Sequence, residues 1–110
     1  RAWVDRVSSA VSGSSQVVRH FSVPGMNHCS AGPAADQFDM LSPLVAWVEQ
    51  GIAPESVKAS VRGAGNAGGV NAELPKEWSI TRTRPLCAYP AVAKYKGSGS
   101  IEDASNFSCQ

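Results

Sequence analysis

The chain has 110 residues, which is enough for one domain at most. Hydrophobic residues make up 43%, as in ordinary globular proteins, and the net charge of +1 is too small to favour nucleic acid or a charged membrane surface as a partner. No apolar run approaches the roughly 20 residues that a helix needs to cross a bilayer. The sequence begins Arg-Ala-Trp, with neither an initiator methionine nor a signal sequence, so we expect a chain cut from a longer one.

The first predicted elements are a helix and a strand. Apolar residues at helical spacing from Ala2 to Val11 predict an amphipathic helix, which the Gly- and Ser-rich residues 12–15 end. Residues 16–23 contain valines and a phenylalanine and predict a short strand. Pro24-Gly25 ends this strand and opens a loop that runs through Pro33.

A second helix is the clearest predicted element. Residues 38–48 carry a strong apolar stripe with a period of 3.6 residues. Asp36 is a plausible N-cap, and Gly51 stands where a left-handed C-terminal cap belongs. Pro43 disfavours a helix interior, so it indicates either a break or a later start of the helix.

The second half of the chain predicts short strands and long loops. Residues 57–61 predict a strand, the glycine-rich residues 62–72 a loop, and residues 78–83 a strand that returns from it. From Pro85 onward we expect an irregular tail that wraps over a surface. Helix, strand, loop and helix are typical of the end of an α/β protein. One or two strands cannot be covered on both faces, so we expect the core to depend on a missing part.

The sequence contains three cysteines, and an odd number cannot be fully paired within one chain. Either the chain is intracellular with free thiols, or one cysteine pairs outside it. A disulfide between Cys87 and Cys109 would constrain the unfolded chain and stabilise the fold by roughly 3 kcal/mol, which suits a tail with little core of its own. Cys29 would then have no partner in the chain.

A histidine, His28, stands on the loop after the first predicted strand, within Val23-Pro24-Gly25-Met26-Asn27-His28-Cys29. In α/β-hydrolases the catalytic histidine lies on a loop after the last central strand, and serine, aspartate and histidine occur in that order. An imidazole suits acid–base catalysis because its ordinary pKa of about 6.5 lets it accept and return a proton near neutral pH. A lone histidine on a loop is more often structural or merely exposed, so its position alone does not identify a catalytic base.

Two long segments resemble the tannase and feruloyl esterase family. Residues 23–51, VPGMNHCSAGPAADQFDMLSPLVAWVEQG, resemble the segment that carries the histidine in that family. Residues 82–109, RTRPLCAYPAVAKYKGSGSIEDASNFSC, resemble its C-terminal end. Together they cover about half of the chain, and their length and order make the resemblance specific. Residues 62–78 resemble the family less, and we expect them to be a variable insertion.

The resemblance implies a fold and a set of site residues. Residues 1–110 would be the C-terminal part of an α/β-hydrolase catalytic domain, with its last strand, histidine loop, C-terminal helix and disulfide-stapled tail. His28 matches the catalytic base of the family. Cys29 matches a cysteine that is disulfide-bonded to the residue before the nucleophilic serine, which here would lie outside the chain. Cys87 and Cys109 match the family's C-terminal disulfide.

The other parts of the family's active site are missing from this sequence. No Gly-x-Ser-x-Gly nucleophile elbow occurs, and the calcium-binding lid domain of the family is absent. We therefore expect no cofactor or metal in the chain itself, and calcium in the absent lid. The family's aspartate precedes the histidine, so Asp36 and Asp39 are interpreted as helix caps or contacts and Asp5 as surface charge.

The resemblance also implies an activity. The parent enzyme would be a carboxylic ester hydrolase of aromatic-acid esters, such as galloyl, feruloyl or terephthaloyl esters. We expect an aromatic ester as substrate, the missing N-terminal part as a partner linked through Cys29, and neither nucleic acid nor membrane. Disulfides indicate an oxidising compartment, so a secreted or periplasmic protein is expected. The alternatives are a non-catalytic structural C-terminal subunit or fragment, and another α/β-hydrolase such as a peptidase.

Three other interpretations of these residues are weaker. A Cys29 thiol nucleophile beside His28 is disfavoured, because adjacent residues in an extended loop point their side chains apart. A metal site of His20, His28 and Cys29 lacks a fourth ligand and the usual spacing. The glycosylation pattern at residues 106–108 is interpreted as accidental.

Overall fold

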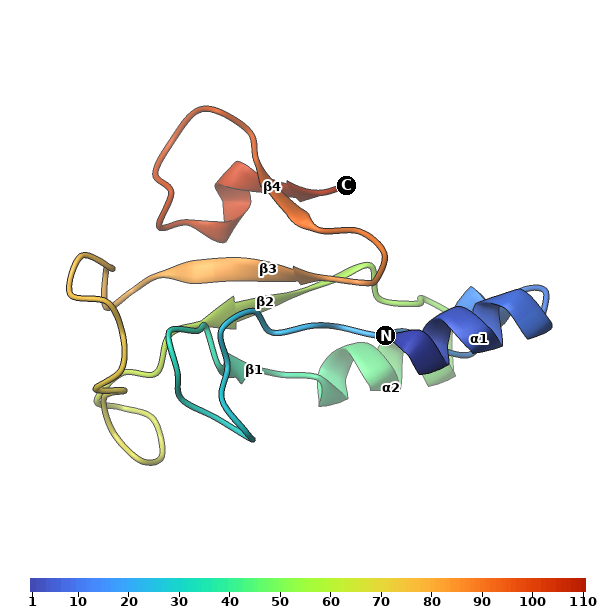
Figure 1. Ribbon diagram of the computed structural model, residues 1–110, viewed down its shortest axis with the longest axis horizontal. Coiled ribbons are helices and arrows are strands. Elements are labelled where there is room, and N and C mark those ends of the chain that lie inside the picture. Colours follow the sequence, from blue (N-terminus) through green and yellow to red (C-terminus); the bar gives the residue numbers. More distant parts are fainter.

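The computed structural model describes all of residues 1–110. Its elements are two helices, two short 3-10 helices and five strands: α1 (Ala2–Ala10), η1 (Ser14–Gln16), β1 (Gln37–Phe38), α2 (Leu41–Gln50), β2 (Ser56–Ser60), β3 (Thr83–Cys87), β4 (Ala93–Tyr95), η2 (Ala104–Asn106) and β5 (Phe107–Cys109). Both helices lie at one end of the molecule, and the tail that contains β4 lies on the side of β3 away from β2 (Figure 1). The mixture of helices and strands agrees with the α/β class.

The centre of the fold is an antiparallel sheet with the strand order β1-β2-β3. Val57 and Ala59 of β2 are buried while Ser56 and Lys58 are exposed, as expected for a strand with one covered face. Ala59 packs with Ala35 and Leu86 in a small core, against which Phe21 and Val23 lie. The predicted strand at residues 57–61 is thereby confirmed, shifted by one residue.

The predicted strand at residues 78–83 is wrong, because β3 begins only at Thr83. Ser79 and Thr81 bond to each other through their hydroxyl groups, and the Ser79 hydroxyl also accepts from the Thr81 amide. Such local bonds compete with a strand ladder. β3 instead contains Pro85, opposite Lys58. In an antiparallel ladder, hydrogen-bonded residue pairs alternate with pairs that make no backbone hydrogen bond. Val61 and Arg82 (Val61 N–H to Arg82 O) and Glu55 and Ala88 (Ala88 N–H to Glu55 O) are hydrogen-bonded pairs, and each lies three positions from the pair of Lys58 and Pro85. The Lys58–Pro85 pair is therefore one that makes no backbone hydrogen bond, so the missing N–H of proline costs nothing there.

The predicted strand at residues 16–23, expected to be the last strand of a hydrolase sheet, is also wrong. Residues 14–16 form η1, and farther along only Phe21 makes a β-bridge, to Ala88. The amide of Tyr89 donates to the carbonyl of His20 at 2.8 Å. The valines and the phenylalanine favour an extended backbone at residues 16–23. Within residues 1–110, however, only Ala88 and Tyr89 pair with this segment.

The helix α2 confirms the second predicted helix with a later start, at Leu41. The carboxylate of Asp39 accepts from the amides of Leu41 (2.8 Å) and Ser42 (3.1 Å), so Asp39 caps this helix and the predicted cap at Asp36 is wrong. Bonds from Ser42 hold the pKa of Asp39 below its ordinary value. Pro43 lies in the first turn, where an amide would have no helical partner. Gly51 ends the helix with φ of 71°, as predicted.

Neither helix buries a residue against the rest of the chain. On α2, the exposed fractions of Leu41, Leu44 and Val48 are 69%, 51% and 77%. The predicted helix α1 is confirmed, and Trp3 on it is also exposed. Neither helix has the length and apolar character that a membrane crossing requires. Most of the apolar stripe that identified α2 in the sequence is therefore left uncovered within residues 1–110, although Trp47 is half-buried.

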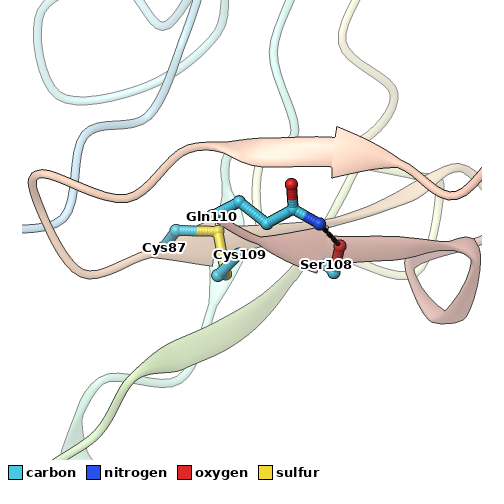
Figure 2. The surroundings of a disulfide bond; sticks show 4 residues. All are labelled: Cys87, Ser108, Cys109 and Gln110. Carbon is cyan, nitrogen blue, oxygen red and sulfur yellow. Dashed lines mark hydrogen bonds between the residues drawn. A yellow bond between two sulfur atoms is a disulfide. The ribbon is translucent and has the colours of Figure 1, made fainter.

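The tail is more ordered than the sequence predicts. β4 and β5 form a second antiparallel sheet, which continues through paired backbone bonds between Val92 and Gln110. The predicted disulfide between Cys87 and Cys109 is confirmed and joins the end of β3 to β5, beside Ser108 and Gln110 (Figure 2). The tail is therefore fixed to the central sheet by a covalent bond.

A partly buried ion pair also fastens the tail. The guanidinium of Arg82 donates two hydrogen bonds of 2.6 Å to the carboxylate of Glu102. It also lies over the ring of Trp78, 3.9 Å from the ring centroid. The bond from Arg82 lowers the pKa of Glu102. A lowered pKa means that Glu102 stabilises the fold above its ordinary pKa, and that this stabilisation is lost as the pH falls through the lowered value.

Replacing Glu102 with alanine should lower the free energy of unfolding by about 2–3 kcal/mol, because Arg82 would keep a charge without a partner. The side chain of Arg82 is 8% exposed, but that of Glu102 is 25% exposed, so the loss is smaller than for a fully buried pair. Urea unfolding of the whole protein, followed by tryptophan fluorescence, measures it. Removing both charges (Arg82→Met with Glu102→Leu) should be milder than Glu102→Ala. An unchanged unfolding midpoint for Glu102→Ala would contradict the expected role.

Candidate functional site

The candidate site lies on the histidine loop, residues 24–36, which leads from Val23 to β1. Gly25 and Gly32 adopt left-handed conformations, with φ of 79° and 76°. A Cβ atom on Gly25 would overlap the carbonyl oxygen of Pro33, and one on Gly32 would overlap that of Gly25. The two ends of the loop therefore meet in a neck that has no room for a side chain at either glycine.

His28 lies in a tight turn above this neck. The amide of Asn27 donates to the carbonyl of Ala31 at 3.1 Å, which closes the turn. Cys29 and Ala31 have φ of 72° and 63°, which residues with a side chain rarely adopt. Such strained conformations persist only where the surroundings enforce them, and they cluster at functional sites. The turn presents the side chains of His28 and Cys29 to solvent.

The side chains of His28 and Cys29 touch, which corrects the expectation that they point apart. The sulfur of Cys29 lies 3.1 Å from Nδ1 of His28. The physical reason is the left-handed backbone at Cys29, which turns the chain back instead of extending it. Cys29 is free and exposed in this chain, and no carboxylate hydrogen-bonds to the ring of His28.

Three polar side chains that the sequence did not assign to the site hold the histidine loop. Buried Asp36 accepts from the amide of Ala31 at 2.7 Å, in place of the helix cap predicted for it. Glu73 accepts from the side chain of Asn27 and from the amide of Gly32, and Asn71 donates to the carbonyl of Gly32. Asn71 and Glu73 lie within residues 62–78, the stretch expected to be a variable insertion, and part of that stretch therefore braces the histidine loop. The only sequence signal for this contact with the histidine loop is the presence of two polar residues, Asn71 and Glu73, directly after the glycine-rich stretch.

The remaining candidate residues lie elsewhere. Asp5 is exposed on α1, in agreement with a role as surface charge. His20 bonds to Ser22 at 3.1 Å and packs edge-on against Tyr89, not against His28. The chain brings together no group of three or more His, Cys, Asp or Glu side chains that could hold a metal ion.

A cavity of about 430 Å³ lies under the base of the histidine loop, between Gly25, Pro33, Trp78 and Phe107. His28 is not among the residues that line it. The chain therefore supplies an exposed imidazole on a fixed loop, but it does not enclose a substrate pocket around that imidazole.

The sequence matches known esterases over almost its whole length. The family profile described as tannase and feruloyl esterase matches residues 4–110. The mono(2-hydroxyethyl) terephthalate hydrolase of Piscinibacter sakaiensis is 50% identical over 107 residues, which are 97% of this chain and 16% of that protein. A probable feruloyl esterase of Arthroderma benhamiae is 38% identical over 94% of this chain and 18% of its own length. The chain thus spans less than a fifth of these two relatives.

Solved structures of esterases also superpose on this chain. An esterase from Aspergillus oryzae superposes with a TM-score of 0.70 at 26% identity, covering 99% of this chain and 23% of that one. Feruloyl esterase B from the same organism superposes with a TM-score of 0.65 at 25% identity and the same coverage. Sequence and structure agree along the whole chain, which therefore belongs to the tannase and feruloyl esterase family.

Proposed function

We propose that residues 1–110 form the C-terminal part of the catalytic domain of a serine carboxylic ester hydrolase with an α/β-hydrolase fold, in which His28 is the general base. The observation that carries the proposal is the presentation of His28: an exposed imidazole on a loop held by a glycine neck and by Asp36, Asn71 and Glu73. Catalysis requires such fixed geometry, because the base must stay within hydrogen-bonding reach of the nucleophile.

In the proposed mechanism, Nε2 of His28 takes the proton from a serine hydroxyl as its oxygen attacks the ester carbonyl. The imidazolium then gives this proton to the leaving alcohol, and an acyl-serine remains. His28 next takes a proton from water, which attacks the acyl group, and returns the proton to the serine as the acid leaves. The serine comes from outside residues 1–110, since no nucleophile elbow occurs in them.

The triad aspartate also comes from outside, and it needs access to Nδ1 of His28. This nitrogen now lies against the sulfur of Cys29. We propose that Cys29 forms a disulfide with a cysteine before the serine, which turns the sulfur away and ties the two catalytic loops together. The disulfides favour a secreted or periplasmic protein.

The proposed substrates are esters of aromatic acids. The names of two relatives contain terephthalate and feruloyl groups, both aromatic acyl groups. The parts of the enzyme that select the acid and the alcohol, including a calcium-binding lid, lie outside this chain in our proposal. Turnover of the whole esterase with and without the His28 side chain tests the proposed function.

Cys29 should be found in a disulfide with a cysteine outside residues 1–110 when the whole esterase is digested without reduction and its peptides are mapped. The same map should contain the Cys87–Cys109 peptide, which serves as the internal control. The reason is that Cys29 is exposed and has no partner in its own chain. A free Cys29 would contradict the disulfide. A free Cys29 whose replacement by serine also abolished turnover would favour a thiol nucleophile, which its contact with His28 makes geometrically feasible.

A further inference from the structure

We propose that Glu73 is a positioning residue for His28: one carboxylate holds both ends of the turn that carries the histidine. This inference rests on the proposed catalytic role of His28. It concerns a residue that lies 46 positions from its partner Asn27 in the sequence.

The carboxylate of Glu73 reaches the turn from both sides. Its two oxygens lie 3.1 and 3.2 Å from Nδ2 of Asn27, the residue directly before His28. One of these oxygens also accepts from the amide of Gly32 at 2.9 Å, just after the turn closes at Ala31. A single side chain therefore fixes the distance between the start and the end of the turn.

Asn71 bonds to both Glu73 and the histidine loop and so fixes their relative position. Asn71 is 2% exposed, and its Nδ2 donates to the carbonyl of Gly32 at 2.8 Å. Its Oδ1 accepts from the amide of Glu73 at 3.0 Å. Gly32 is thus held at its N–H by Glu73 and at its C=O by Asn71. Buried polar groups that are paired in this way specify one conformation.

The remaining bonds of the turn lie within the histidine loop, since Asp36 and the glycine neck belong to the same segment. Outside the histidine loop, only residues 71–73 form hydrogen bonds with the turn. The side chain of Glu73 is exposed, so its bonds compete with water and contribute little to global stability. A displaced base, in contrast, strongly affects the rate, because a shift of about 1 Å can lower it by about 10²-fold. Glu73 should therefore act on turnover more than on stability.

Replacing Glu73 with alanine in the whole esterase should lower kcat by about 10- to 100-fold and leave KM and the thermal unfolding midpoint nearly unchanged. The matched control is Glu77→Ala, which removes an exposed carboxylate that makes no hydrogen bond and should keep full turnover. Glu73→Gln retains one acceptor oxygen and should recover part of kcat. The pH at which kcat/KM is half-maximal should stay the same in both Glu73 variants. A Glu73→Gln variant as slow as Glu73→Ala, with a shifted pH profile, would show an effect of charge and overturn positioning.

Two further measurements separate this inference from the proposed function. If His28→Ala keeps its turnover, the proposed function fails, whatever Glu73 does. If His28→Ala is inactive while Glu73→Ala keeps the wild-type kcat, the positioning role alone fails. Hydrogen exchange in the peptide that contains Gly32 gives a readout independent of activity: it should be faster in Glu73→Ala than in Glu77→Ala. Unchanged exchange would overturn the proposed bond to Gly32.

Discussion

Replacing His28 with alanine should lower kcat of the whole esterase by at least about 10³-fold, because the members of a catalytic triad act as a unit. Without an imidazole, the serine hydroxyl has no acceptor for its proton during attack, and the leaving alcohol has no donor. The fold should be unaffected, since His28 is exposed and bonds only to Cys29. Initial rates with a chromogenic aromatic ester measure the loss, and circular dichroism and thermal unfolding check the fold.

His20 provides a matched control, because it is the only other histidine in the chain and bonds to Ser22. His20→Ala should keep a turnover close to that of the wild type. If His28→Ala does so too, His28 is not the base, and the alternative of a non-catalytic structural segment gains support.

Residues 1–110 by themselves should show no cooperative unfolding transition and no hydrolysis of an aromatic ester above the buffer rate. Only 13 of the 110 residues are buried, whereas ordering the backbone opposes folding by roughly 1–2 kcal/mol per residue. The stripe on α2 leaves Leu41, Leu44 and Val48 in water, which forgoes roughly 1.5–3 kcal/mol for each. Thermal unfolding and an esterase assay of the purified chain provide the measurement.

Addition of the N-terminal part, covalently or as a separate chain, should restore both folding and turnover. The substitution Val48→Ser on the exposed stripe distinguishes the isolated chain from the whole esterase. It should change little in the isolated chain but destabilise the whole esterase, where we expect this side chain to be covered. A sharp transition and sustained turnover of residues 1–110 alone would contradict the expectation.

Local signals in the sequence predicted the helices well. The apolar period of α2 and the left-handed cap at Gly51 depend on residues within one or two turns, so they can be identified without the rest of the fold. The predicted cap was three residues too early, because both Asp36 and Asp39 satisfy the pattern and only the structure shows that Asp36 is buried against the amide of Ala31.

Pairing between distant segments was predicted poorly. Residues 16–23 have the composition of a strand, but composition cannot show that Ala88 alone would bridge to Phe21. The sequence predicted an irregular tail beginning at Pro85. A proline is excluded from most ladder positions. Pro85 fits β3 only because of the register with Lys58, which depends on the whole sheet.

The candidate site was predicted in part. The disulfide between Cys87 and Cys109 followed from the cysteine count and the family resemblance, and the structure confirms it. The catalytic role of His28 stays a prediction. The contact of Cys29 with His28 was missed because nothing in the sequence indicates a left-handed backbone at a cysteine. Glu73 was missed because its partner Asn27 lies 46 positions away.

The brace between the histidine loop and residues 71–73 has a consequence for recombination between members of this family. A crossover anywhere from residue 37 to residue 70 would combine the loop of one parent with the brace of the other. Such chimaeras would retain every side chain of the loop itself and still lose its geometry if the second parent lacks an acceptor at the place of Glu73. Residues 24–73 are therefore the smallest block that can be exchanged with the geometry of the base intact.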